Sequence, residues 1–164
     1  MTQAATVLGA PPGAPAVRLL NATERDLDDA DLRAWAREET AGAPYSSRSY
    51  RYPYALVARH TAPVGVDLEE VQPFDPAFAE SILTPSERRL LRADLDLADL
   101  WCSKEALAKA LGDALSYDPR RLQSPAHWPQ ARSGPWNAAP LVVPGGYRGW
   151  LCWREPSTIS DGPC

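Results

Sequence analysis

The chain has 164 residues, 45% of them apolar and 23% charged, which suits one domain with one hydrophobic core. Its net charge of −4 and pI of about 5.2 argue against a general nucleic-acid binder, and no apolar run approaches the roughly 20 residues that span a bilayer. Three cysteines without a CxxC spacing and two histidines support neither a disulfide framework nor a zinc site. With no signal peptide at its start, the chain is expected to be soluble and cytoplasmic.

The first third of the chain shows few regular patterns. Residues 1–16 are small, apolar and proline-rich, and we expect them to be disordered or loosely packed. Residues 28–39 begin with acidic side chains and place Leu32 and Trp35 on one face, which predicts a short helix. Residues 41–49, AGAPYSSRS, are typical of a turn-rich linker.

Two short apolar runs follow, YALVAR at 54–59 and VGVDLE at 64–69. Their valine and leucine content and the short HTAP segment between them predict an antiparallel pair of strands. Side chains alternate between the two faces of a strand, so Asp67 and Glu69 are expected to emerge on the same side.

Two helices are predicted after the strands. Thr84 and Glu87 have the spacing of a capping box, with Pro85 at the first helical position, so a helix is expected from about Pro85. A second helix is expected over 97–111, with Gly112 as its C-terminal cap.

The second helix carries two different stripes. One predicted stripe is buried and apolar; it consists of Leu100, Leu107 and Leu111. The other aligns an aromatic, an acidic and a basic side chain at four-residue intervals; it consists of Trp101, Glu105 and Lys109. Beyond this helix, the proline-rich residues 118–144 predict mostly irregular structure, GGYRGWLCW at 145–153 predicts a final strand, and residues 154–164 are expected to form a flexible tail.

Carboxylates and lysines from these elements suggest a site. The carboxylates of Asp67 and Glu69 can converge on one small cation, and Glu105 can supply a third oxygen, which suits Mg²⁺ sharing its shell with phosphates. Only two of the 17 basic residues are lysines, and both, Lys104 and Lys109, flank Glu105. An ammonium can bind a phosphate oxygen and also release a proton, which a guanidinium does not do.

Each of these features has an ordinary alternative. An acidic pair on a strand is usually a solvated face, and Glu105 with Lys109 makes a common helix-surface ion pair. The two lysines could also be chance survivors of an arginine-biased composition. Taken singly, the features do not separate a functional site from a charged surface.

The order of the two segments resembles a known signature. VGVDLE followed by LWCSKEALAKALG is similar to the GVD-x-E and W-x-x-KE-x-x-x-K motifs of the phosphopantetheinyl transferase superfamily. TPSERRLL resembles that family's helix between the motifs, and GGYRGWLCW resembles its last strand. The resemblance covers about residues 40–153 and is most secure over 45–115.

The resemblance implies an α+β fold in which a small antiparallel sheet packs against a long helix. It implies Mg²⁺-dependent transfer of phosphopantetheine from coenzyme A to a serine of an acyl or peptidyl carrier protein in natural-product biosynthesis. In this chain Asp67, Glu69 and Glu105 would hold the metal, and Glu105 would also activate the serine. Lys109 would neutralise or protonate the leaving group, and Lys104 would help hold the CoA phosphates.

The resemblance also suggests where the partner docks. Carrier proteins tend to present an acidic helix, and the predicted capped helix bears Arg88, Arg89 and Arg92. A solvated helix face is an equally good explanation for each arginine.

The chain departs from the family pattern on the CoA side. The usual Ser-His-Ser/Thr is SSRS here, which places Arg48 at the histidine position, and the usual Gly-Lys/Arg-Pro turn has Ala43 at its centre. Residues 17–60 are too few for a full N-terminal lobe ahead of a transferase-like lobe at 61–153. Either they form a shortened lobe, or a second subunit of a homo-oligomer completes the site.

These departures keep two other functions open. One is a repurposed enzyme that has lost CoA and performs a tailoring step, such as a cyclisation or elimination, in natural-product biosynthesis. Five tryptophans could line an apolar pocket for it, although core packing is the favoured explanation for them: Trp101, Trp128, Trp136, Trp150 and Trp153. The other is a non-enzymatic lobe that binds a carrier protein or a partner subunit, which gives no reason to crowd carboxylates together.

Overall fold

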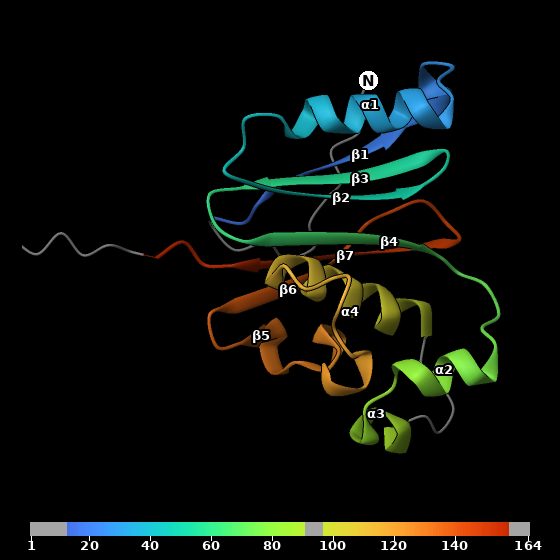
Figure 1. Cartoon of the computed structure of the whole chain (residues 1–164), viewed down its shortest axis with the longest axis vertical. Coiled ribbons are helices and arrows are strands. Elements are labelled where there is room, and N and C mark those ends of the chain that lie inside the picture. Colours follow the sequence, from blue (N-terminus) through green and yellow to red (C-terminus); the bar gives the residue numbers. More distant parts are fainter. Residues whose placement is uncertain (1–12, 91–96, 158–164) are drawn as a thin grey trace, which may run out of the picture.

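The computed structural model describes residues 13–90 and 97–157. Expectations for 1–12 and 158–164 fall outside the described residues. Two antiparallel sheets lie face to face, and a helix covers the outer face of each, as the stacked layers in Figure 1 show. The α+β class is confirmed. Among the described helices, none is long and apolar enough to cross a membrane.

The first sheet has the strand order β1-β3-β2 and the second has the order β4-β7-β6-β5. The first consists of β1 (Ala16–Asn21), β2 (Tyr45–Arg51) and β3 (Tyr54–His60). The second consists of β4 (Val64–Glu70), β5 (Arg132–Ser133), β6 (Trp136–Leu141) and β7 (Tyr147–Arg154). The helices are α1 (Asp29–Thr40), α2 (Pro76–Ile82), α3 (Pro85–Leu90) and α4 (Leu97–Leu111), with 3₁₀ turns η1 (Ala22–Glu24), η2 (Pro119–Arg121), η3 (Pro125–His127) and η4 (Pro129–Ala131).

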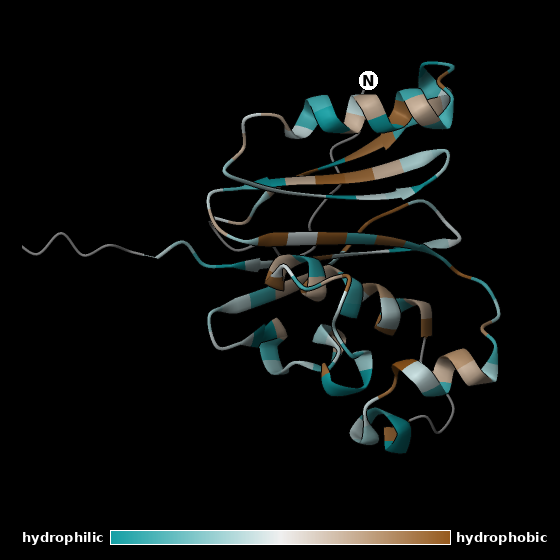
Figure 2. Cartoon of the chain, viewed as in Figure 1, coloured by the Kyte–Doolittle hydropathy of each residue, from teal (hydrophilic) through white to brown (hydrophobic). Residues whose placement is uncertain are grey.

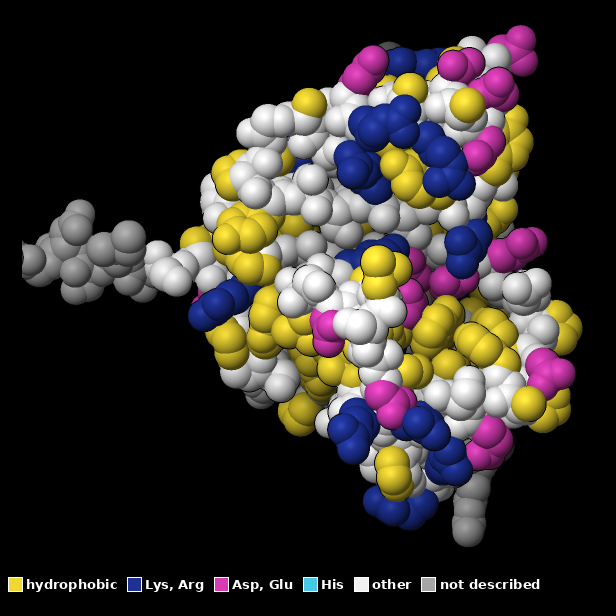
Figure 3. Space-filling view, viewed as in Figure 1, with side chains coloured by type: hydrophobic (Ala, Val, Ile, Leu, Met, Phe, Trp, Pro, Cys, Tyr) yellow, Lys and Arg dark blue, Asp and Glu magenta, His cyan; other side chains and the backbone are white. Residues whose placement is uncertain are grey.

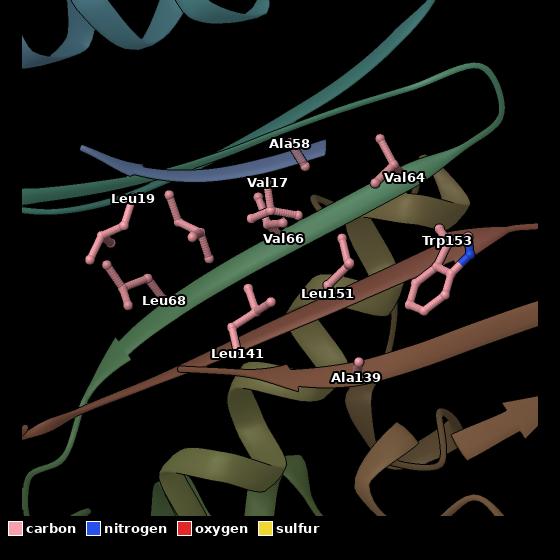
Figure 4. Packing of buried hydrophobic residues seen from close by; sticks show 11 residues of the cluster. Val17, Leu19, Ala58, Val64, Val66, Leu68, Ala139, Leu141, Leu151 and Trp153 are labelled. Carbon is pink, nitrogen blue, oxygen red and sulfur yellow. The ribbon is translucent and has the colours of Figure 1, made fainter. Parts of the chain in front are cut away.

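The main core lies between the two sheets. Alternate side chains of β1 and β3 pack against alternate side chains of β4, β6 and β7, as seen from close by in Figure 4. Figure 2 shows the hydrophobic residues concentrated on β3 and β4 in the middle of the stack. A second core joins α1 to the outer face of the first sheet, and a third joins α4 to the outer face of the second. Because β4 is covered on both sides, Asp67 and Glu69 are buried and do not form a solvated face.

The predicted strand pairing is wrong. β3 pairs with β1 and β2, whereas β4 pairs with β7, so the two runs belong to different sheets. The predicted linker is also wrong, since most of it is β2. β2 was missed because its serines and arginines carry no apolar alternation. β1 and β6 were not predicted either.

The predicted helices are confirmed within about one residue. α4 has the expected bounds, and Gly112 follows it with φ of +78°, a conformation that favours glycine. The capping box forms, with Thr84 N–H donating to Glu87 Oε2 at 2.8 Å and Glu87 N–H donating to Thr84 Oγ1 at 3.2 Å. One detail is wrong: Leu111 is 46% exposed, because the buried stripe of α4 turns to alanines and Cys102.

Close contact between α4 and β4 depends on Gly65. A Cβ atom at this position would lie 1.9 Å from the carbonyl oxygen of Ala106 and 2.5 Å from the backbone nitrogen of Ala110. Only glycine therefore lets the helix backbone approach the strand this closely. This approach brings α4 side chains next to the Asp67 and Glu69 side of β4.

Candidate active site

The site lies where the edge strand of one sheet meets the edge strand of the other. β2 and β4 share no backbone ladder, but serine hydroxyls of β2 accept hydrogen bonds from the free edge of β4. Val66 N–H donates to Ser47 Oγ at 3.0 Å, and Leu68 N–H donates to Ser49 Oγ at 3.1 Å. These bonds satisfy backbone donors that would otherwise be buried without a partner. They also fix how the two sheets are placed relative to each other at the site.

Asp67 is the most buried acid of the site, with 3% of its surface exposed. Its Oδ1 accepts hydrogen bonds from Lys109 Nζ at 2.7 Å and from Ser49 Oγ at 2.9 Å. Lys109 also donates to the carbonyl oxygen of Val66 at 3.1 Å. The other oxygen, Oδ2, is buried, and no group among the described residues donates to it. An unsatisfied buried carboxylate oxygen is costly, so this atom is suited to a cation or a water molecule.

Glu69 lies two residues further along β4, on the same side. It forms an ion pair with Arg51 of β2 at 2.6 Å. Burial and then the nearby Asp67 carboxylate raise the pKa of Glu69 to about 7, although Arg51 opposes the shift. Arg51 was not singled out in the sequence, because nothing local shows that β2 and β4 meet.

Glu105 comes from the facing side of α4. Its Oε1 accepts a hydrogen bond from the hydroxyl of Tyr117, a residue beyond the end of the helix. Burial raises the pKa of Glu105, and the Asp67 charge adds to this rise against the opposing bond from Tyr117. Tyr117 was missed by sequence reasoning, since it lies outside both motifs.

The three predicted metal ligands line one cavity of about 280 Å³. Its lining residues are Arg33, Arg48, Ser49, Tyr50, Arg51, Asp67, Glu69, Glu105 and Lys109. Within residues 13–90 and 97–157, however, no three acidic, histidine or cysteine side chains are gathered as a ready metal centre. Each carboxylate is instead bonded to a partner of its own: Lys109 for Asp67, Arg51 for Glu69 and Tyr117 for Glu105.

A larger cavity of about 630 Å³ adjoins the first and shares part of its lining. Arg33, Arg37 and Arg48 line it together with Lys109, and the segment 112–116 forms another wall. Figure 3 shows Lys and Arg side chains gathered toward the α1 side of this face, with acidic side chains nearer the middle. Arg33 and Arg37 were missed because they lie on α1, whose outward face looked like an ordinary charged surface.

Contacts on α1 and β2 hold two of these arginines, Arg33 and Arg48, at the cavity wall. The Arg33 guanidinium lies 4.5 Å from the centre of the Tyr50 ring and forms an ion pair with Asp29 at 2.8 Å. Arg48 Nη1 donates to Thr40 Oγ1 at 2.9 Å. The cavity therefore presents several cations in a defined arrangement, which is suited to a ligand with more than one phosphate.

Lys104 does not lie at the cavity, and its predicted role in binding CoA phosphates is corrected. The side chain is fully buried on another face of α4. Its ammonium donates to Glu87 Oε2 at 2.6 Å, to the carbonyl oxygen of Pro119 at 2.9 Å and to that of Ile82. All three protons are thus used in joining α2, α3, α4 and η2. Lys104 is next to Glu105 in sequence, but helical geometry points it elsewhere.

The other predicted residues take varied positions. Arg88 and Arg89 are exposed on α3, where Arg88 pairs with Glu80 at 2.9 Å; Arg92 is outside the described residues. Trp150 and Trp153 are buried in the cores on the two faces of the second sheet, as core packing predicts. Trp128 and Trp136 are partly buried against the α4 core, and Trp101 packs edge-on against Phe78.

Comparisons with known proteins agree with the motif pattern. Residues 63–140 match the family model of the 4'-phosphopantetheinyl transferase superfamily. The chain is 39% identical over 62 residues to 4'-phosphopantetheinyl transferase psf-1 of Bacillus pumilus, covering 34% of this chain and 27% of that protein. It is 38% identical over 65 residues to L-aminoadipate-semialdehyde dehydrogenase-phosphopantetheinyl transferase of Schizosaccharomyces pombe, covering 34% of this chain and 25% of that protein.

The matches thus span about a quarter of the length of these curated relatives. The matched region contains β4, α4 and the three carboxylates that line the smaller cavity. The resemblance read from the sequence is therefore confirmed: residues 63–140 of this chain carry the pattern of the 4'-phosphopantetheinyl transferase superfamily.

Proposed function

We propose that this protein transfers the phosphopantetheine arm of coenzyme A to a serine hydroxyl of an acyl or peptidyl carrier protein, with Mg²⁺. One observation carries the proposal: a cavity whose lining includes three carboxylates, three arginines and a lysine opens beside a larger cavity lined by three arginines and the same lysine. The first suits a cation on a pyrophosphate, and the second suits the remaining phosphate of a nucleotide.

The arginine-lined cavity supports CoA as the donor. CoA carries a pyrophosphate and a 3'-phosphate; Arg48 supplies a charge at the usual histidine position, and Arg33 and Arg37 can supply the charge that the Gly-Ala-Pro segment lacks. This compensation weighs against the alternative in which CoA is lost and only a tailoring enzyme remains. It also supports residues 17–60 as a shortened lobe that completes the site within one chain, because these residues provide the arginines.

The smaller cavity fits Mg²⁺. Asp67 Oδ2 is buried without a donor from any described residue, and burial, together with the neighbouring Asp67 carboxylate, raises the pKa of Glu69 to about 7. Asp67, Glu69 and Glu105 would hold the metal. Bound there, Mg²⁺ would neutralise charge on the pyrophosphate and on the breaking phosphoanhydride bond.

The side chains around this cavity then have separate roles in the transfer. Glu105 would accept the proton of the carrier serine, directly or through water. The serine oxygen forms a bond to the phosphorus that bears the pantetheine arm. The bond from this phosphorus to the bridging oxygen breaks, and adenosine 3',5'-bisphosphate leaves with the electron pair. Lys109 neutralises or protonates that oxygen.

A carrier protein would approach from the side of α3. Arg88 and Arg89 are exposed there, and both can attract an acidic helix, although Arg88 is already paired with Glu80. Such contacts steer the encounter more than they add affinity. Arg92 stays part of this proposal from the sequence alone.

The test is direct transfer observed by intact mass spectrometry. The purified protein is incubated with CoA, Mg²⁺ and several unmodified carrier proteins, and a mass gain of one phosphopantetheine is expected on at least one carrier. Glu105→Ala should abolish the gain. Glu24→Ala, which removes an exposed glutamate that lines neither cavity, should preserve it. Absence of any gain together with absence of CoA binding would favour the repurposed enzyme instead.

A further inference from the structure

The segment after α4 folds back toward the helix. Gly112 ends the helix, Asp113 N–H donates to the carbonyl oxygen of Ala108 at 2.9 Å, and Tyr117 N–H donates to the carbonyl oxygen of Asp113 at 3.0 Å. These backbone bonds reverse the chain within one short turn. They bring the Tyr117 hydroxyl to Glu105, which lies twelve residues earlier in the sequence.

The segment that follows α4 contributes to both cavities. Residues 112–116 form a wall of the larger, arginine-lined cavity, while Tyr117 bonds to a carboxylate of the smaller, acidic one. In this bond the phenol hydroxyl of Tyr117 is the donor and Glu105 Oε1 is the acceptor.

We propose that Tyr117 is a positioning residue for Glu105: its hydroxyl holds Oε1 and leaves Oε2 to the cation that Asp67 and Glu69 share. The inference rests on the proposed function, since it concerns the same metal site. Carboxylates that bind metals are commonly hydrogen-bonded by a neighbouring group, and the loss of such a group costs about 10–100-fold in metal affinity or activity. A long glutamate side chain has several rotamers, so a fixed oxygen lowers the entropy lost on binding.

Tyr117→Phe is a suitable probe of this role. It removes one oxygen atom from a half-buried side chain and leaves the backbone bonds of the turn in place. Tyr52→Phe is the matched control, because the Tyr52 hydroxyl also donates within the chain, to the carbonyl oxygen of Leu27 at 3.1 Å, but lines neither cavity.

The measurement is calorimetric titration with Mg²⁺ alone, without CoA or carrier protein. Tyr117→Phe should weaken Mg²⁺ binding by about 10-fold or more, and Tyr52→Phe should leave it unchanged. In a double-mutant cycle, adding Tyr117→Phe to Glu105→Gln should weaken binding no further, since the group being positioned is already altered. The turnover number should fall while the KM for CoA stays near that of the wild type. Melting temperatures without metal check that the variants fold.

The outcomes separate this inference from the proposed function. Equal Mg²⁺ affinities of Tyr117→Phe and wild type would overturn the positioning role and leave the transferase proposal standing. A loss of the same size in the Glu105→Gln background would also overturn it, because the effect would then be structural. If the wild type itself binds no Mg²⁺, the metal part of the proposed function fails and this inference fails with it.

Discussion

Two lysines of the same helix form ion pairs that differ in burial and in the hydrogen bonds around them. Lys104 and Lys109 both lie on α4, and each pairs with a carboxylate, at 2.6 and 2.7 Å. The side chains of Lys104 and its partner Glu87 are 0% and 1% exposed, whereas Lys109 is 24% exposed. The first pair is sealed inside the protein, and the second forms part of a cavity wall.

The two pairs also differ in how completely the carboxylate oxygens are hydrogen-bonded. Glu87 accepts hydrogen bonds from Lys104, Thr84 N–H and Ser124 N–H, so neither of its oxygens lacks a donor. Asp67, the partner of Lys109, keeps one buried oxygen that no described residue satisfies. An ion pair whose oxygens all accept hydrogen bonds holds secondary-structure elements together, whereas an ion pair with one oxygen lacking a donor leaves that atom available to a ligand. The charges of the two pairs alone would not have distinguished them.

The largest effect is expected from breaking the sealed pair. Lys104→Met should lower the free energy of unfolding by about 3–5 kcal/mol, because the Glu87 charge stays buried without its partner. Denaturant unfolding measures this loss. Adding Glu87→Gln should recover part of it, since the buried charge is removed, although the single amide oxygen can accept only one of the N–H groups of Thr84 and Ser124, which bond to different oxygens of Glu87. A loss below about 1 kcal/mol would place the pair with ordinary surface ion pairs.

A substitution in the pair formed by Lys109 and Asp67 should change the activity and leave the stability nearly unchanged. Lys109→Arg keeps the fold and the positive charge, but it should lower turnover about 100-fold because a guanidinium does not release a proton to the leaving group. The melting temperature should stay near that of the wild type. Turnover close to normal in this variant would remove proton transfer by Lys109 from the mechanism.

The unsatisfied oxygen can be tested with metal and temperature. Mg²⁺ at ten times its dissociation constant should stabilise the wild type by about 1.4 kcal/mol, read as a higher melting temperature, and Asp67→Ala should lose this response. Asp31→Ala, on the surface of α1, should respond like the wild type. If Mg²⁺ leaves the melting temperature of the wild type unchanged and the substitution Asp67→Ala by itself raises it, the carboxylates are only a repulsive cluster.

The pH dependence of the free energy of unfolding should distinguish Glu87 from Glu69 by a smaller effect. Burial would raise the pKa of Glu87, but its bonds to Lys104, Thr84 and Ser124 outweigh burial and lower it, so this stabilisation is lost as acid reaches the folded-state pKa. The pKa of Glu69 is raised to about 7, so its contribution is present below about pH 4.5 and is lost as pH rises toward 7.

Stability measured against pH in a chelator can separate these two contributions. Glu87→Gln should flatten the acid limb of the curve, and Glu69→Gln should flatten the change between about pH 4.5 and 7. An unchanged slope over that interval in Glu69→Gln would mean that Glu69 is not held in a crowded, buried site.

Short-range patterns were enough for several parts of this protein. The bounds of α4, the capping box at Thr84 and Glu87, and the shared side of Asp67 and Glu69 all follow from spacings of a few residues. Helix and strand periodicity and capping are local effects, so a single sequence contains them. The resemblance to the transferase superfamily also rests on two such local motifs.

Only the tertiary structure decided which edges meet. It placed the polar strand β2 against β4, which brought Arg51 to Glu69 and Ser49 to Asp67, and it put the α1 arginines on the cavity wall. It also separated two neighbours in sequence, sending Glu105 to the acidic cavity and Lys104 into the sealed pair with Glu87. The physical reason is that burial and partners of a polar side chain depend on chain segments far apart in the sequence. Local spacing identifies the charged residues, whereas packing determines which of them have all their hydrogen-bond partners within the protein and which remain available to bind a ligand.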